Sequence, residues 1–295
     1  MSIFLSVILI LLLILLWVMI FDTHRFVVRR EKISDKRIKK PFRAVIISDL
    51  HNKRYGKDNE KLIKAIKDEH PDMILVAGDI PHAIPGRSTE VAGRLISALA
   101  ADFPIYYGNG NHEYRMKIYE EDYHGAYKEY ENAVKSYGVN LLSNETVDLE
   151  EYGISITGLE IDREYYKRFH SVKMGDEYMK DTLGTPHDGK YNILIAHNPD
   201  FFPHYAKWGA DLTISGHIHG GIIRVPAPRK REGAGTKIEM RGLLSPSISF
   251  FPKYDGGRFE ESGRTLIVSR GLGDHSVCLR LFNPAEIVTV DFDIM

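Results

Sequence analysis

The sequence predicts an α/β layered fold that follows one membrane-spanning helix. Three observations support this prediction. Short β-branched runs alternate with amphipathic helical patterns in the first half of the chain, which is typical of largely parallel strands covered by helices. From residue 140 onward short apolar runs dominate, which indicates a second sheet. The first 21 residues are almost uniformly apolar, unlike the rest of the chain.

The amino-terminal segment has the length and composition of a membrane span. Ile3 to Phe21 is a run of 19 residues with one polar member, Ser6. A helix that rises ~1.5 Å per residue would cross most of a ~30 Å hydrocarbon core over this length. No Lys or Arg precedes the run and no small-x-small cleavage site follows it, so a retained anchor is favoured over a removed signal peptide. We therefore expect residues 1–22 to be a transmembrane anchor.

The next segment, residues 23–40, is predicted to be a basic juxtamembrane linker, with the catalytic domain at 41–295. It carries eight basic residues: Arg25, Arg29, Arg30, Lys32, Lys36, Arg37, Lys39 and Lys40. Positive charge beside a span favours the cytoplasmic side, so we expect a single-pass protein of the cell membrane with its domain in the cytoplasm. The sequence leaves open whether this linker is solvated or lies on anionic lipid headgroups.

The first half of the domain alternates strands and helices. Buried strands are predicted at 43–48, 73–77 and 104–107, and helices at 58–70, 88–101 and 117–137. Ser88 suits the N-cap position of the second helix. Metal-ligand residue types follow each of the three strands: Asp49 and His51, then Asp79, then Asn111 and His112.

The second half is richer in strands. They are predicted at 147–149, 154–157, 192–196, 212–214, 266–269 and 287–290, with a short helix at 200–208. We expect a partly helical surface excursion at 163–188 and a long loop-rich stretch at 222–265, which contains four prolines. Ligand-type residues again follow two strands: His197 after 192–196, and His217 and His219 after 212–214.

His217 and His219 lie between glycines in Ser215-Gly-His-Ile-His-Gly-Gly221. In extended backbone, residues i and i+2 point to the same side, so both imidazoles can aim at one place. Ligands of open α/β sheets gather at the carboxyl ends of the strands. The repeated placement of polar side chains directly after strands therefore predicts one shared site.

Carboxylate, imidazole and amide donors without thiolate suit manganese, iron, zinc or magnesium. The donors are too many for one ion, and two divalent ions ~3.5–4 Å apart would use them all. Such a pair lowers the pKa of a bridging water and places hydroxide in line with a bound phosphorus. The net charge of −1 provides no basic field for nucleic acid, and the lone Cys278 excludes a disulfide framework or a Cys-type zinc site within one chain.

The ordered blocks resemble the calcineurin-like metallophosphoesterase superfamily. They are Asp49-x-His51, Gly78-Asp79, Gly110-Asn-His-Glu113, His197 and Gly216-His217-x-His219. Later stretches at 242–246, 251–254 and 269–273 further resemble a bacterial membrane-anchored subgroup. The resemblance implies a four-layer α/β/β/α sandwich, in which two mixed sheets are flanked by helices.

The resemblance also implies residue roles. Asp49, His51 and His219 would bind one metal, Asn111, His197 and His217 the other, and Asp79 would bridge both, with manganese favoured. His112 would stabilise the transition state or protonate the leaving oxygen instead of binding metal. The phosphoprotein phosphatases of this superfamily carry an Asp that orients this His, and here His82 occupies that position. The resemblance thus does not support a protein phosphatase, and it leaves open what orients His112.

These features predict a membrane-tethered dimetal phosphohydrolase that cleaves a phosphodiester or phosphomonoester by attack of a metal-bridging hydroxide. Of the two activities, a phosphodiesterase is favoured. One alternative is a pyrophosphatase acting on a lipid-linked nucleotide or a phospholipid headgroup, because a tether concentrates the enzyme at a membrane substrate. The apolar stretch 245–252 would support an acyl pocket. A second alternative is a metal-free interaction scaffold on the same fold. Substrate identity, the physiological metal and the oligomeric state stay open at this point.

Overall fold

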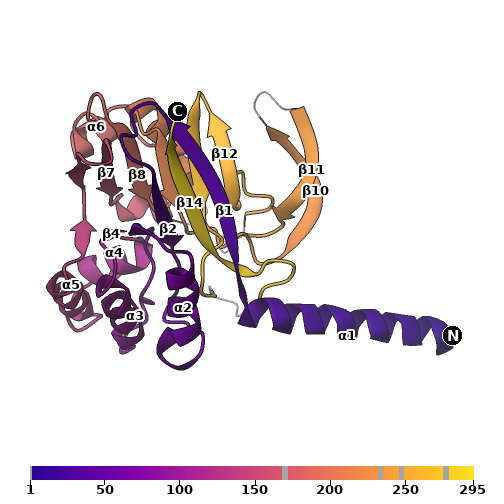
Figure 1. The fold of residues 1–295 in the computed structure, drawn as a ribbon. Helices are drawn as coiled ribbons and strands as arrows, with labels where there is room; N and C mark the ends of the chain where they lie inside the picture. Colours follow the sequence, from indigo (N-terminus) through magenta and orange to yellow (C-terminus); the bar gives the residue numbers. More distant parts are fainter. Residues whose placement is uncertain (1, 168–171, 232–234, 246–248, 275–278) are drawn as a thin grey trace.

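Two six-stranded mixed sheets pack face to face in the computed structural model of the chain, and helices cover their outer faces (Figure 1). This arrangement confirms the predicted α/β sandwich. The structure describes residues 2–167, 172–231, 235–245, 249–274 and 279–295. Cys278 and part of the apolar stretch 245–252 lie outside these ranges.

The first sheet has the strand order β1-β14-β2-β3-β4-β5. Its strands are β1 (Phe26–Asp35), β2 (Phe42–Ile47), β3 (Met73–Val76), β4 (Ile105–Gly108), β5 (Asn140–Leu142) and β14 (Ala285–Ile294). Strands β2 to β5 are parallel, and β14 runs antiparallel to β2 and parallel to β1. The carboxyl ends of β2, β3 and β4 therefore lie at one edge.

The second sheet has the order β12-β13-β9-β8-β7-β6. Its strands are β6 (Glu145–Leu149), β7 (Ile154–Leu159), β8 (Tyr191–Ala196), β9 (Leu212–Ser215), β12 (Gly257–Glu261) and β13 (Arg264–Val268). Strands β7, β8, β9 and β13 are parallel, while β6 and β12 are antiparallel at the two sides. The six ranges predicted as strands in the second half of the chain agree with β6, β7, β8, β9 and β13 of this sheet and with β14 of the first sheet.

The central core lies between the two sheets, where apolar side chains from alternate strand positions meet. Ile46 and Leu75 of the first sheet, and Ile156, Ile193 and Ile214 of the second, are buried in one cluster. Burying apolar surface contributes roughly 25 cal/mol per Å², so this layer supplies much of the force that holds the sheets together. The same packing fixes the carboxyl ends of strands from both sheets next to each other.

Helices cover the two outer faces (Figure 1). The first face is covered by α2 (Glu60–Asp68), α3 (Glu90–Ala100) and α5 (Ala126–Ser136), and the second by α6 (Tyr178–Leu183) and α7 (Phe202–Trp208). Single 3-10 turns occur at Lys57–Asn59, Arg163–Tyr166 and Pro199–Phe201. The one helix predicted at 117–137 is wrong. It is replaced by α4 (Asn111–Ile118) and α5, because Gly125 adopts φ 74° directly before α5.

The predicted linker 23–40 is also wrong, because it contains β1. Phe26 and Val28 pack into the outer core and Ile33 into the central core. The basic side chains that suggested a solvated segment are neutralised by carboxylates elsewhere in the chain. Arg29 pairs with the buried Glu286 at 3.1 Å and Arg30 with Glu69. Seven of the eight basic residues form such ion pairs.

The stretch 222–265 is more regular than the prolines suggested. Strands β10 (Arg224–Arg231) and β11 (Gly235–Gly242) form a separate two-stranded antiparallel sheet that projects from the globular part (Figure 1). Pro226 and Pro228 lack an N–H for a ladder, but a strand at the edge of a ribbon tolerates such residues. We call this unit the β10–β11 hairpin.

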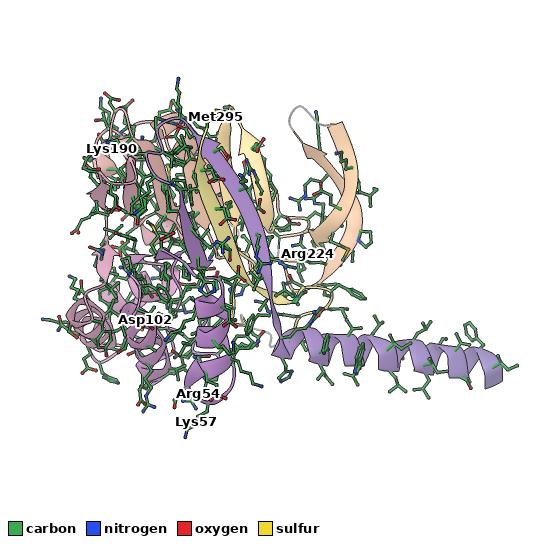
Figure 2. All side chains as sticks on the ribbon, in the orientation of Figure 1. Arg54, Lys57, Asp102, Lys190, Arg224 and Met295 are labelled. Carbon is green, nitrogen blue, oxygen red and sulfur yellow. The ribbon has the colours of Figure 1, made fainter. Side chains whose placement is uncertain are left out.

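Helix α1 (Ser2–His24) projects away from the globular part, on the side where the hairpin lies (Figure 1). Its segment Ile3–His24 is long and apolar enough to cross a membrane, and none of its most apolar window is buried. Figure 2 shows its side chains extending outward all around the helix. Only one residue separates α1 from β1.

Candidate metal centre

The strand ends of both sheets bring the predicted ligands into one cluster. Asp49 and His51 follow β2, Asp79 follows β3, and His197 and His219 follow β8 and β9. Two groups of these side chains have ligand atoms within 4.8 Å of one another: Asp49 with His51 and His219, and Asp49 with Asp79 and His197. Asp49 belongs to both groups.

The distances within the cluster are short. The Nε2 atoms of His51 and His219 lie 3.1 Å apart, and His219 Nε2 lies 3.3 Å from Asp49 Oδ1. His197 Nε2 lies 3.1 Å from Asp79 Oδ2 and 3.7 Å from Asp49 Oδ1. Imidazole nitrogens and carboxylate oxygens that converge in this way offer the donor set of a divalent transition metal.

Asn111 and His217 complete the set. Asn111 Oδ1 lies 2.8 Å from His217 Nδ1, and the His217 ring lies 5.3 Å from the ring of His197. Asn111 is the first residue of α4, where the chain leaves β4. The structure thus brings all seven predicted ligands together.

Several of these residues adopt backbone conformations that are rare for their type. Asp49, His51, Asp79, His217 and His219 all have φ between 50° and 70°. Such left-handed conformations cost roughly 1–3 kcal/mol each and cluster at functional sites. Five strained residues in one cluster indicate that the fold is organised to aim these side chains.

Two glycines allow the close approach of the loops. A Cβ atom at Gly110 would overlap Asp79 Oδ1, and one at Gly216 would overlap Asp49 Oδ2. Any larger residue would push a carboxylate out of the cluster, since both contacts are with buried side chains. Glycine is therefore required at positions 110 and 216, because no side chain fits there.

Hydrogen bonds outside the cluster orient the ligands. His197 Nδ1 lies 2.6 Å from the Ala77 carbonyl, so this nitrogen donates and Nε2 keeps its lone pair for the cluster. The Ser48 hydroxyl and the His217 backbone N–H donate to Asp49. These contacts fix the rings and carboxylates before any ligand arrives.

Glu113 organises the loops that carry Asp79 and Asn111. Its side chain is fully buried and accepts the backbone N–H groups of Asp79, Ile80 and Gly110 at 2.9–3.1 Å. The Tyr107 hydroxyl donates to it at 2.6 Å. One carboxylate thereby joins the ends of β3 and β4.

His112 is oriented by the backbone. The Ala83 N–H donates to His112 Nδ1 at 2.9 Å, and the His112 N–H donates to Asp79 Oδ1 at 2.7 Å. A neutral His112 that accepts at Nδ1 carries its proton on Nε2, which lies 3.9 Å from Asp79 Oδ2. The Ala83 N–H is therefore the group that orients the His112 ring, a point that the sequence left open.

The electrostatics of the cluster favour added positive charge. Burial raises the pKa of Asp49 to about 6. Burial alone would lower the pKa of His197, but the Asp79 and Asp49 carboxylates outweigh it and raise this pKa to about 10. Two carboxylates buried together thus draw a cation, either a proton on His197 or a bound metal.

A family model for calcineurin-like phosphoesterases matches residues 42–221, which is more than half of the chain. The chain belongs to this family. The predicted superfamily is confirmed, and with it a metal-dependent phosphoesterase. Proteins of this family use divalent metals, and the His/Asp cluster of this phosphoesterase could hold them.

Three bacterial relatives are similar over most of this phosphoesterase. The metallophosphoesterase Cj0846 of Campylobacter jejuni is 27% identical over 86% of this chain, which spans only 60% of that protein. The UDP-2,3-diacylglucosamine pyrophosphatase LpxG of Chlamydia muridarum is 24% identical, over 83% of this chain and 82% of its own length. The phosphodiesterase YaeI of Escherichia coli is 24% identical over 63% of each chain.

Two residues beside the cluster were missed by the sequence. The His82 ring lies 5.0 Å from the rings of both His51 and His112, so it lines the site. Tyr166, from the expected surface excursion, places its ring 5.3 Å from His217. The position of His82, three residues after Asp79, was the available signal, whereas nothing in the sequence marked Tyr166.

Tyr55, Asn52 and Arg54 lie in the loop that follows the Asp49-x-His51 block. The Tyr55 side chain is buried and its hydroxyl donates to the Leu272 carbonyl, and Asn52 donates to the Ser88 carbonyl. Arg54 is exposed and lies at the far end of the loop that precedes α2 (Figure 2). The first two are therefore already engaged within the fold.

The end of α1 is hydrogen-bonded to the metal centre through one residue. The buried Asn283 donates its side-chain amide to the His219 carbonyl at 2.8 Å, and its backbone N–H donates to Asp22 at 3.1 Å. Lys53, two residues after His51, donates to the Thr23 carbonyl at 2.6 Å. The cluster therefore lies beside the point where α1 joins the globular part.

Proposed function

We propose that this phosphoesterase is a membrane-tethered dimetal phosphohydrolase that cleaves a phosphodiester or a phosphomonoester. The observation that carries the proposal is the convergence of seven ligand-type side chains from both sheets at one place. The fold holds them there with left-handed backbone and buried hydrogen bonds, which a scaffold without metal would not need.

Each ligand has a proposed role. One ion would be held by Asp49, His51 and His219, and the other by Asn111, His197 and His217, with Asp79 between the two sets. When bound, the two ions supply an activated water and neutralise charge on the phosphate oxygens. We favour manganese, because mixed carboxylate, imidazole and amide donors suit it.

His112 acts on the reacting phosphate. Its Nδ1 is held by the Ala83 N–H, so the Nε2 proton is directed toward the cluster. A proton at that position stabilises charge on a phosphoryl oxygen or passes to the leaving oxygen.

The test compares the full-length chain in detergent micelles with Asp79→Asn, on aryl phosphodiester and phosphomonoester substrates with several divalent metals. We expect a loss of at least ~100-fold in kcat for the variant, since Asp79 Oδ2 lies 3.1 Å from His197 Nε2 and 4.0 Å from His51 Nε2. Asp68→Asn is the matched control, because Asp68 is an exposed helix residue. Equal inactivity of wild type and Asp79→Asn with every metal would contradict the proposal. Little bound metal in the purified protein would favour the scaffold alternative.

A second candidate is a pyrophosphatase acting on a lipid-linked nucleotide or phospholipid headgroup. The hydrogen bonds from Asp22 through Asn283 to His219 support it, because they place the cluster at the end of the apolar helix. The similarity to a protein named UDP-2,3-diacylglucosamine pyrophosphatase is a further support. Mixed micelles of a lipid-linked nucleotide should be turned over at least ~10-fold faster than its deacylated form. Equal rates for the two would contradict this candidate.

We also propose that the domain lies in the cytoplasm, on the charge argument for residues 25–40. Protease added to intact cells tests this topology. A cytoplasmic domain is protected, and its degradation would overturn the proposed side.

A further inference from the structure

The β10–β11 hairpin has an apolar face that points away from the domain. In the register of the hairpin, Pro226 lies opposite Met240 and Pro228 lies opposite Ile238. Opposed residues of an antiparallel pair share one face, so these four side chains form a continuous strip. All four are exposed, Ile238 by 70% and Met240 by 41%. We call this strip the outward face.

The other face of the hairpin carries charged side chains and points toward the domain. Arg229 and Arg241 line a cavity of about 730 Å³ together with Phe259 of β12. Arg229 forms a buried ion pair with Asp255 and lies 3.3 Å from Glu239. The hairpin is thus inverted relative to a strand pair in water, because its charges are inside and its apolar strip is outside.

The base of the hairpin is tied to the segment that holds the end of α1. The Arg224 N–H donates to the Leu281 carbonyl at 3.0 Å, and the Arg280 N–H donates to the Thr23 hydroxyl at 3.2 Å. Figure 1 shows the hairpin at the outer side of the globular part, toward which α1 projects, and Figure 2 places Arg224 at its base. The outward face therefore has a fixed position relative to α1.

More exposed apolar side chains lie in the segments that join the hairpin to α1. They are Phe250 at 70%, Phe251 at 41%, Leu279 at 40% and Phe282 at 44% exposed. Leu244 bridges to Phe250 and Ile223 bridges to Leu281, so these segments are continuous with the hairpin base. Leu279 and Phe282 lie beside Arg280, whose N–H bonds to Thr23, so exposed apolar side chains lie between the hairpin base and the end of α1.

We propose that the outward face, with Leu279 and Phe282, is inserted in the boundary between headgroups and acyl chains of the bilayer that α1 spans. The inference rests on the proposed membrane tether. A bilayer is the occupant because α1 already requires lipid on this side, and the surface continues from it.

The contact would set where substrate enters. Arg224 donates to the Gly220 carbonyl at 2.9 Å, and the Ile222 N–H donates to the Leu244 carbonyl at 2.8 Å, directly after His219. A hairpin that lies on the bilayer therefore holds the metal cluster next to the headgroup layer. The substrate class that fits is a phosphoester carried by a membrane lipid.

The test uses the full-length chain, one copy per lipid nanodisc, in a Cys278→Ser background. Ile238→Cys and Met240→Cys carry an environment-sensitive fluorophore, and Ile294→Cys is the control because Ile294 is 51% exposed near the carboxyl terminus, away from α1. Lipids with a nitroxide near the headgroup should quench the labels at positions 238 and 240 at least about threefold more than the label at 294.

Equal quenching at positions 238, 240 and 294 would overturn the proposal. Protection of the labels from quenching that appears only with two copies per disc would also overturn the proposal, since the outward face would then bind a second chain. Carbonate extraction of membranes separates the two claims. Release of the protein would remove the tether and this inference together, whereas retention without quenching at 238 would remove the hairpin contact alone.

Discussion

Replacement of Glu113 by glutamine should both destabilise the protein and weaken its metal centre. The carboxylate accepts four donors, two at each oxygen: Asp79 and Gly110 at Oε2, and Ile80 and Tyr107 at Oε1. An amide of the same shape has only one oxygen. Its best orientation places the NH₂ group toward Ile80 and Tyr107, where the hydroxyl can turn to accept but the Ile80 N–H cannot.

The cost follows from this count. One unpaired buried donor costs ~1–3 kcal/mol. A loss of this size lowers the Tm of a domain of this size by roughly 2–12 °C. Because the Asp79 N–H stays bonded but its loop loosens, the Kd for manganese should rise by about 10- to 100-fold.

Circular dichroism of the full-length chain in detergent micelles measures the Tm, and metal titration measures the Kd. Glu90→Gln is the matched control, since the Glu90 side chain is exposed and pairs with Arg94 on its own helix. We expect this control to stay within about 1 °C of wild type. A Glu113→Gln Tm within the same margin would refute the assignment of Glu113 as the residue that holds these loops.

Three further predictions concern the centre and the sheet beside it. His112→Ala should lower kcat by about 10²- to 10⁴-fold while the metal content measured by mass spectrometry stays unchanged; lost metal would make His112 a ligand. Removal of metal by a chelator should abolish turnover and lower the Tm, and added manganese should restore both; an unchanged Tm would argue against a structural contribution of the ions. For Glu286, burial opposes the charge, but Arg29 and Arg270 outweigh it and lower its pKa to about 2. Its stabilisation of about 3 kcal/mol is therefore complete above the unfolded pKa of ~4.3 and is lost as the pH falls toward 2. Glu286→Gln should lack this component of the Tm-against-pH curve, and identical curves would contradict the ion pairs.

The candidate site could be read from the sequence because its logic is local. Each ligand-type residue directly follows a short β-branched run, and parallel strands place their carboxyl ends at one edge. Asp79 after β3 and His197 after β8 are examples. Their distance in the chain exceeds 100 residues, yet the pattern predicted that both would reach the same cluster.

What the sequence did not show depends on distant partners. The charges of β1 indicated a linker, and the distant Glu286 and Glu69 explain why Arg29 and Arg30 can lie in a sheet. The prolines of β10 likewise indicated a loop, because a two-stranded ribbon with both prolines on one face has no local signature. Tyr166 reaches His217 by tertiary packing, and no motif surrounds it.

The single residue between α1 and β1 has a consequence for how this enzyme would find its substrates. Without a flexible linker, the globular domain cannot move away from the membrane surface to bind molecules in bulk solution. If α1 is embedded as proposed, domain and helix diffuse as one rigid particle, and encounters become two-dimensional. An inserted flexible spacer of about twenty Gly/Ser residues between α1 and β1 would have an r.m.s. span of roughly 25 Å. It would let the globular domain move freely, but the domain would lose its fixed orientation to the membrane.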